Sequence, residues 1–173
     1  MPPLIKDGAL QPDRWTLLRD AYSLADLPGR GAVIVPLALW LAERGSLRAR
    51  GDVGVLLGPE HDPADLGSDV ATLPLVAVDF PSFTDGRGYS IARLLRERLR
   101  FAGELRAVGD VLRDQLYLLA ECGFDAFSLR EDRDAAAALL GLADFTGVYA
   151  PTTRTPQPRF RRAAAAPAWF PEI

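Results

Sequence analysis

The sequence has one cysteine and one histidine among its 173 residues. A single cysteine, Cys122, excludes an intramolecular disulfide framework, which fits a reducing cytosol. The single histidine, His61, excludes a metal cage of histidines and thiolates, and too few ligands are present for an iron–sulfur cluster. We therefore predict no metal site. A serine nucleophile with a histidine base would have to use His61.

Long apolar runs and a strong charge imbalance are also missing. The longest apolar run, residues 32–42, is too short to span a bilayer and is interrupted by Pro36. The first fifteen residues lack the charged start and long apolar core of a signal peptide. The formal net charge of −3 argues against a nucleic-acid or anionic-membrane binder. We expect a cytoplasmic protein with no membrane and no nucleic-acid partner.

What the sequence does contain is a regular alternation of strand and helix patterns between residues 31 and 151. Strands are predicted over 31–36, 52–58, 75–80, 104–109, 124–130 and 146–151, and helices over 37–47, 62–73, 90–99, 110–123 and 132–145. This alternation predicts an α/β domain with a mainly parallel sheet of five to six strands, because parallel neighbours need crossover helices. An open doubly wound sheet and a half-barrel both fit the pattern.

The two ends of the chain differ from this domain. Residues 1–30 are predicted to form an irregular lead-in with one short helix over 14–25, "RWTLLRDAYSLA". Residues 152–173 contain four prolines and four arginines, which predicts a flexible, basic, Pro-rich tail. The alternative is a tail that binds an acidic partner surface or nucleic acid, with Trp169 and Phe170 as anchors.

Polar residues follow several of the predicted strands, at the edge where open parallel sheets bind ligands. These residues are Glu60, His61, Asp79, Asp110, Arg130, Glu131 and Asp132. The loop "FTDGRGYS" (83–90) belongs to the same edge, between a strand and a helix. His61 is predicted to be a surface residue, with a general base as the alternative.

The loop has the composition of an anion-binding segment. Two glycines allow positive φ and close approach of the backbone to a ligand, and a serine N-cap satisfies one amide of the next helix. Two arginines lie beside the helix N-terminus, where a nearby anion relieves their unfavourable interaction with the helix dipole. The predicted anion-binding residues are Thr84, Asp85, Gly86, Arg87, Gly88, Ser90 and Arg93. The alternative is a rigid turn in which Asp79 and Asp85 pair with the arginines.

Two carboxylates are the candidate catalytic groups. If Asp79 and Asp110 lie close together, each shifts the pKa of the other, which is how such pairs divide acid and base roles. The alternatives are an ion pair for Asp79 and a helix N-cap for Asp110. The loop does not complete the dinucleotide motif G-x-G-x-x-G, because Ile91 stands at the third glycine and five residues precede the first. No cofactor is assigned.

Five blocks of the sequence together resemble a family of short, uncharacterised bacterial proteins. The blocks are "VPLALWLA" (35–42), "DVGVLLGPEHDP" (52–63), "VAVDFPSFTDGRGYSIARLLRERL" (76–99), "GELRAVGDVLRDQLYLLAECGFDAF" (103–127) and "FTGVYAP" (145–151). The genes of this family commonly lie beside those for sulfite or nitrite reductase and cysteine synthesis, and its members are often labelled as oxidoreductases of sulfite reduction. The resemblance implies a role in assimilatory sulfite reduction. The tail after Pro151 lies outside the family pattern.

The resulting hypothesis is an accessory protein or enzyme of assimilatory sulfite reduction with an anion-binding loop at residues 83–93. The expected partners are a small anionic ligand and, from the resemblance, sulfite reductase or its electron donor. A homo-oligomer stays open. The alternative function is a non-catalytic protein-interaction module that binds the reductase or its electron donor. A third hypothesis, an enzyme of the phosphate-sugar type on a barrel-like scaffold, rests on fold analogy alone.

Overall fold

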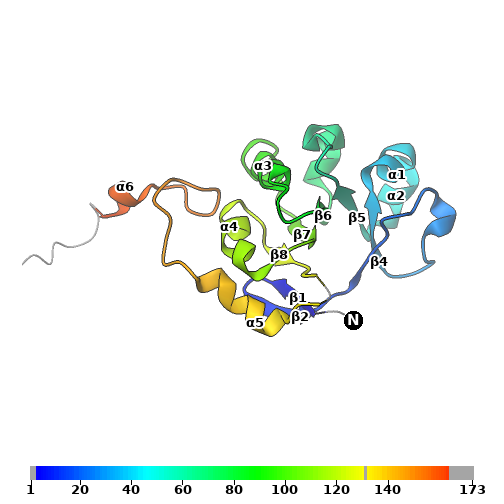
Figure 1. Ribbon diagram of the computed structural model, residues 1–173. Helices are drawn as coiled ribbons and strands as arrows, with labels where there is room; N and C mark the ends of the chain where they lie inside the picture. Colours follow the sequence, from blue (N-terminus) through cyan, green and yellow to red (C-terminus); the bar gives the residue numbers. More distant parts are fainter. Residues whose placement is uncertain (1–2, 131, 164–173) are drawn as a thin grey trace, which may run out of the picture.

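Eight strands form one sheet in the computed structural model, which describes residues 3–130 and 132–163. The strands are β1 (Pro3–Lys6), β2 (Ala9–Pro12), β3 (Trp15–Leu17), β4 (Ala32–Pro36), β5 (Val53–Leu57), β6 (Leu75–Phe80), β7 (Glu104–Gly109) and β8 (Ala126–Phe127). Their order in the sheet is β2-β1-β8-β7-β6-β5-β4-β3. The predicted α/β class is confirmed, and the sheet is a strongly curled half-barrel rather than an open doubly wound sheet (Figure 1).

Strands β3 to β8 are parallel and lie in chain order, whereas β1 is antiparallel to both of its neighbours. Continuous apolar sequence explains the central strands. All five residues of β5, "VGVLL", are buried, as is typical of parallel strands that are covered on both faces. Successive side chains of each strand then serve two different cores, one on each face of the sheet.

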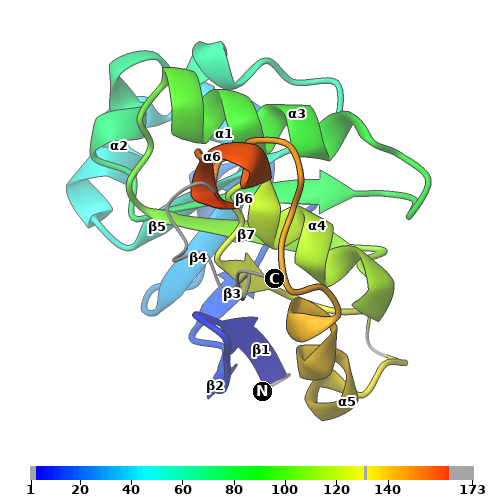
Figure 2. The ribbon, with the colours of Figure 1, turned by 90° about the vertical axis from the view of Figure 1, so that its left-hand side faces the viewer.

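Most of the helical elements join the strands and cover the outer face of the sheet, whereas the last helix, α6 (Arg159–Ala163), lies away from it (Figure 1). The α-helices are α1 (Leu37–Ala42), α2 (Arg44–Arg50), α3 (Arg87–Arg93), α4 (Leu116–Glu121), α5 (Ala135–Leu139) and α6 (Arg159–Ala163). The short 3₁₀ elements are η1 (Leu24–Asp26), η2 (Pro63–Ala71), η4 (Arg113–Gln115) and η5 (Leu140–Ala143), and η3 (Leu94–Arg98) is a π-helical turn that continues α3. Figure 2 shows α1, α2, α3 and α4 on one side of the strands. None of the described helices is long and apolar enough to cross a membrane.

The main core lies between these helices and the outward side chains of the strands, such as Val55, Val78 and Leu105. A second, smaller core fills the inner face of the curl. It consists of Ile34, Leu56, Leu75, Ala77 and Val108, with the half-buried side chains of Trp15 and Leu17 packed against it.

The two edge strands of the sheet are joined by only two residues, Asp13 and Arg14. Strand β2 is antiparallel to β1, which is antiparallel to β8, so β2 points in the same direction as β3. Three trans peptide steps span at most about 11 Å, so the two edges meet at this point. In Figure 1 the blue segment runs from the β1–β2 hairpin to the side of β4. The sheet must therefore curl strongly for one bent segment to supply both edges.

A buried arginine connects this bend to the middle of the sheet. Arg106 occupies an inward position of β7 and is only 2% exposed. Its Nη1 donates to Asp13 Oδ2 at 2.8 Å, and its Nε donates to Glu104 Oε1 at 2.7 Å. Lys6 of β1 donates to Glu104 Oε2 at 2.8 Å. Charges buried in a protein must be paired, and here the pairs join β1, β7 and the bend.

The N-terminal lead-in was predicted wrongly. Instead of an irregular segment with a helix, residues 3–17 supply β1, β2 and β3. Asp7 and Gly8, both with positive φ, form the tight turn of the β1–β2 hairpin, and an Asp-Gly pair is a hairpin signal in sequence. Residues 15–17 alternate between half-buried and exposed, which is the period of a strand.

The structure also differs from the other predicted helices and strands in several places. The helix predicted over 62–73 is η2, and Asp62 caps it, because its side chain accepts from the amide of Ala64 at 2.8 Å. The predicted helix over 37–47 is two helices that meet at Glu43. The predicted strand over 146–151 is not a strand, since the backbone there forms bends and irregular segments.

The first residues of the predicted tail contact the domain. Thr152 Oγ1 donates to Glu121 Oε2 at 2.5 Å, and Thr153 Oγ1 donates to Glu97 Oε1 at 2.8 Å. Figures 1 and 2 show this segment leaving the domain toward α6. The predicted anchors Trp169 and Phe170 lie outside the described residues.

We predict that Arg106→Met lowers the free energy of unfolding by about 3 kcal/mol or more, because Asp13 and Glu104 lose their buried counter-charge. Arg14→Ala is the matched control, since Arg14 is exposed and adjacent to Asp13. We expect it to change the free energy of unfolding by less than about 0.5 kcal/mol. Urea unfolding of both variants measures the difference, and equal stabilities would refute the structural role of Arg106.

Candidate functional site

The two candidate catalytic carboxylates lie at the carboxyl ends of the adjacent strands β6 and β7. Asp79 is the penultimate residue of β6, and Asp110 follows directly after β7. By strand alternation Asp79 shares the inner face with Leu75 and Ala77 of the small core. In barrel and open α/β folds, ligands bind at this edge of the sheet.

Asp79 has one bound and one unbound carboxylate oxygen. Oδ2 lies 2.6 Å from Nη1 of Arg19, a residue that follows β3. Oδ1 is buried, and no donor among the described residues forms a hydrogen bond with it. Gly109 makes room for this oxygen, since a Cβ at that position would lie 2.7 Å from Oδ1. The backbone of Gly109 also has a φ of +99°, which side chains rarely tolerate.

Asp110 has a different set of partners. Its Oδ2 accepts from the amide of Phe83 at 3.1 Å, and its Oδ1 accepts from Nη1 of Arg130 at 2.9 Å. Arg130 also holds Asp132 through Nε and Nη2. The predicted N-cap role of Asp110 is wrong, because the next helical turn begins at Arg113. Asp110 instead ties the loop after β6 to the segment after β8. Glu131, the other predicted residue of that segment, lies outside the described residues.

The two loop arginines are paired with nearby carboxylates rather than with Asp79. Arg87 contacts Asp85 through Nε at 3.0 Å and through Nη2 at 2.6 Å. Arg93 contacts Glu97, one helical turn along, at 3.1 Å. The hydrogen bonds of Asp85 with Arg87 lower the pKa of this carboxyl group. These are the contacts of the rigid-turn alternative, with Glu97 in the place expected for Asp79.

The other predicted loop residues stabilise the turn. Thr84 Oγ1 lies 2.9 Å from Ser82 Oγ, and Gln115 donates to the carbonyl of Phe83 at 2.9 Å. Ser90 lies inside α3, which begins at Arg87 after Gly86 as N-cap, so its predicted capping role is wrong.

Neither loop glycine has positive φ. Gly86 has a φ of −80°, and no atom lies within 4 Å of where its Cβ would be. Gly88 is buried, and a Cβ there would lie 2.5 Å from the Phe80 ring. Gly88 therefore lets α3 approach β6 closely, which is a packing role and not an approach to a ligand.

His61 lies at the same edge after β5. Its Nδ1 accepts from the amide of Gly58 at 2.8 Å, and its Nε2 lies 3.4 Å from Glu60 Oε1. In the neutral ring the proton is therefore on Nε2, because Nδ1 serves as an acceptor.

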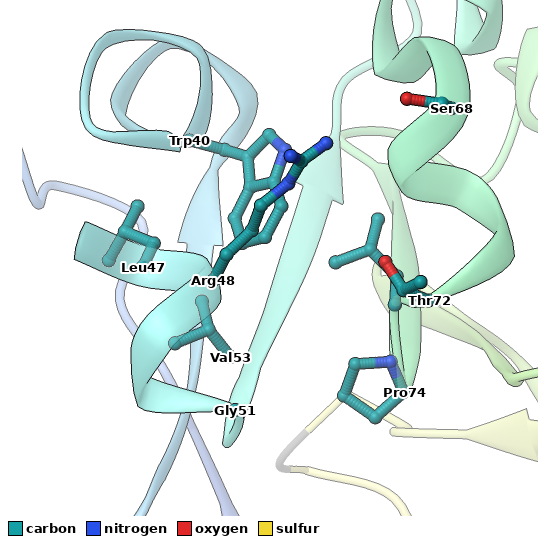
Figure 3. Close-up of a pocket in the computed structure, with 9 residues that line it drawn as sticks. Trp40, Leu47, Arg48, Gly51, Val53, Ser68, Thr72 and Pro74 are labelled. Carbon is teal, nitrogen blue, oxygen red and sulfur yellow. The ribbon is translucent and has the colours of Figure 1, made fainter. Parts of the chain in front are cut away.

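A pocket of about 510 Å³ lies on the helical side, away from the carboxyl edge (Figure 3). In Figure 3 Arg48 lies beside Trp40, with Ser68 and Thr72 on the opposite wall. The guanidinium group of Arg48 forms an ion pair with Asp69, a fully buried carboxylate. Asp69 also accepts a hydrogen bond from Trp40 Nε1 at 2.9 Å. This group links α1, α2 and η2, and we interpret it as structural.

Arg19 is the site residue that sequence reasoning missed. The sequence predicts a helix over 14–25, which leaves no strand end before Arg19. The Asp-Gly turn at residues 7–8 was the available signal, because it predicts strands in this region.

These features define an α/β half-barrel protein with a charged carboxyl edge. The chain belongs to DUF934, a family of bacterial proteins of unknown function, whose model matches residues 54–160. The match includes Asp79, Asp110 and Arg106 but not Asp13 or Arg19. It continues past Pro151 to Phe160, so the start of the predicted tail lies inside the family. No curated protein and no solved structure matches the chain.

The contrast between the two loop glycines gives a test of their roles. We predict that Gly88→Ala lowers the free energy of unfolding by about 1 to 3 kcal/mol, because the new methyl group overlaps the buried Phe80 ring. Gly86→Ala is the matched control and should change it by less than about 1 kcal/mol. Chemical denaturation compares the two variants, and a neutral Gly88→Ala would disprove the packing role.

The pairing of Arg87 with Asp85 is also testable. We expect the pKa of Asp85, followed by carboxyl ¹³C NMR, to lie below that of an ordinary aspartate and to rise toward it in Arg87→Ala. The lowered pKa means that the pair stabilises the fold near neutral pH, and that this contribution is lost as the pH falls through the folded-state pKa. Arg93→Ala is the control, since Arg93 contacts Glu97. An unchanged titration in Arg87→Ala would show that the two groups are not paired in solution.

Proposed function

We propose that this protein binds a small oxyanion at the carboxyl edge of the half-barrel, between Arg19 and Asp79. This proposal rests on the difference between the two carboxylate oxygens of Asp79. One oxygen is held by Arg19 at 2.6 Å, and the other is buried without a hydrogen-bond donor among the described residues. A buried acceptor without a donor is costly, so a ligand that supplies the donor is favoured.

The chemistry of the two residues narrows the class of ligand. Arg19 is 41% exposed and retains donors that an anionic oxygen can accept from. Asp79 Oδ1 requires an O–H or N–H donor. An oxyanion that carries a proton, such as hydrogen sulfite or hydrogen phosphate, supplies both an anionic oxygen and an O–H group. In this arrangement Asp79 is also the group that accepts the ligand's proton if a reaction follows.

Asp110 and the loop 83–93 then have supporting roles. Asp110 fixes the loop through the amide of Phe83 and is itself held by Arg130. Arg87 is 60% exposed at the rim, where its positive charge attracts anions even while it contacts Asp85. The loop is thus the wall of the site, and Asp79 with Arg19 is its centre.

The biological setting that we propose follows from the family resemblance. Genes of such proteins lie beside those for sulfite or nitrite reductase, so we propose an accessory protein or enzyme of assimilatory sulfite reduction. Sulfite is then a natural ligand of the Asp79 site.

The alternative is a protein-interaction module that binds the reductase or its electron donor. Four large apolar residues near the C-terminal part of the domain favour it, namely Leu140, Phe145, Tyr149 and Phe160, each at least 60% exposed. Stable capture of a reductase by a protein that binds no oxyanion would favour this alternative.

We predict that the wild-type protein binds phosphate at least about tenfold more tightly than sulfate near neutral pH, because only phosphate carries a proton for Asp79. Asp79→Asn should abolish this preference, because an amide NH₂ group can donate to sulfate. Arg19→Ala should weaken binding of sulfite and phosphate alike. Isothermal titration calorimetry measures each affinity.

Arg87→Ala is the control for general charge effects and should keep the preference for phosphate over sulfate. The proposal fails if neither sulfite nor phosphate binds at about 10 mM, which is about ten times the Kd of about 1 mM expected for a weak specific site. It fails equally if Asp79→Asn leaves the preference unchanged.

A further inference from the structure

A second pocket lies at the opposite end of the half-barrel, where the parallel strands begin. Its volume is about 310 Å³, and its walls include Trp15 at the start of β3 and Glu104 at the start of β7. Asp79, in contrast, lies near the end of β6. The pocket is therefore distinct from the proposed oxyanion site. Its volume is at the lower end of the size range of small-molecule sites.

Three residues of this pocket carry N–H groups without an acceptor among the described residues. Arg106 is 2% exposed, and its Nη2 lies 2.7 Å from Glu104 Oε1 without the geometry of a hydrogen bond. Arg14, an exposed residue of the pocket wall, forms no ion pair with any described carboxylate. The indole N–H of Trp15 has no described acceptor either. The buried Nη2 of Arg106 favours a ligand that supplies an oxygen acceptor, and the more accessible donors of Arg14 and Trp15 can bind the same ligand.

The charges of the wall favour a single negative charge on that ligand. Lys6, Arg14 and Arg106 are basic, and Asp13 and Glu104 are acidic, which leaves an excess of one positive charge. A monoanion neutralises this excess, whereas a dianion leaves a negative charge beside the two carboxylates. A planar carboxylate also matches the planar donor fork of a guanidinium group.

Apolar side chains line the rest of the pocket, including Leu4, Pro12 and the ring of Trp15. Contact with these groups stabilises an apolar stem attached to the carboxylate. We propose that the amino end of the half-barrel is a binding site for a small organic monocarboxylate, held by Arg106 and Arg14 with its stem against Trp15.

The test uses defined probes on the full-length protein. Propionate and benzoate represent the proposed ligand, propionamide is the neutral analogue of propionate, and sulfate is the inorganic dianion. Isothermal titration calorimetry measures all four, and the fluorescence of Trp15 reports occupancy of the pocket, with Trp15→Phe identifying its signal. We expect both carboxylates to bind and to change this fluorescence, and we expect the amide to bind at least about tenfold more weakly.

Two arginine variants assign the binding. Arg14→Ala should weaken carboxylate binding by about tenfold or more, whereas Arg98→Ala should leave it unchanged, because Arg98 is also exposed but lies outside the pocket. Arg106→Lys keeps the charge but lacks the Nη2 donor, so it should weaken binding if the variant folds. Asp79→Asn should have no effect, which separates this site from the oxyanion site.

Four results would overturn the proposal. The first is the absence of carboxylate binding at about 10 mM, which is about ten times the Kd of about 1 mM expected for a weak site. The second is equal binding of propionamide and propionate. The third is tighter binding of sulfate than of either carboxylate. The fourth is an equal loss of affinity in Arg14→Ala and Arg98→Ala, which would mean that carboxylates bind to surface charge in general.

Discussion

The buried ion pair between Arg106 and Asp13 is the interaction on which the shape of this protein depends. Arg106 projects from β7 in the middle of the sheet, and Asp13 lies at the bend between the two edge strands. Apolar packing on the inner face favours curling, but apolar contacts are not directional. The hydrogen bonds of the Arg106 guanidinium group are directional, because its planar fork holds Asp13 and Glu104 at the same time. The pair therefore specifies where the bend must lie relative to the centre of the sheet.

The candidate site at the other end of the strands is a consequence of this curl. Arg19 follows β3 and Asp79 belongs to β6, and β4 and β5 lie between these strands in the sheet. In a flat sheet with a spacing of about 4.8 Å per strand, the two strands would be about 14 Å apart. Because the sheet curls, the long side chain of Arg19 reaches Asp79 across the inner face. The ion pairs at the amino end and the proposed ligand site at the carboxyl end thus depend on the same curl of the sheet.

The inner face is layered along the strand direction. Charged residues around Arg106 lie at the amino end, the small apolar core of Ile34, Leu56 and Ala77 follows, and Asp79 with Arg19 lies at the carboxyl end. Barrel interiors are filled by layers of side chains in a similar way. The apolar layer separates the two polar ends, so the two proposed ligand sites share no residues.

Much of the fold could be predicted from local pattern. Strands β4 and β5 are apolar runs, and β6 and β7 are apolar except for Asp79, Glu104 and Arg106. The intervening helices have recognisable starts, as Asp62 shows. Strands β1 to β3 were missed because their local sequence is weakly apolar and half exposed. Their strand conformation is fixed by partners such as Ile34 and Phe127 that are distant in sequence. The glycine loop was placed correctly after β6, but its contacts depend on the Phe80 ring beneath Gly88, which no local pattern reveals.

The sequence by itself determined the α/β class, the mainly parallel pairing of the central strands and the position of Asp79 at a strand end. Each of these follows from periodicity or from residues that are neighbours in the chain. The tertiary structure alone decided the half-barrel, the pairing of Asp79 with Arg19 and the burial of Arg106 against Asp13. Those contacts join residues 60 to 93 positions apart, and only the curl of the sheet brings them within hydrogen-bonding distance.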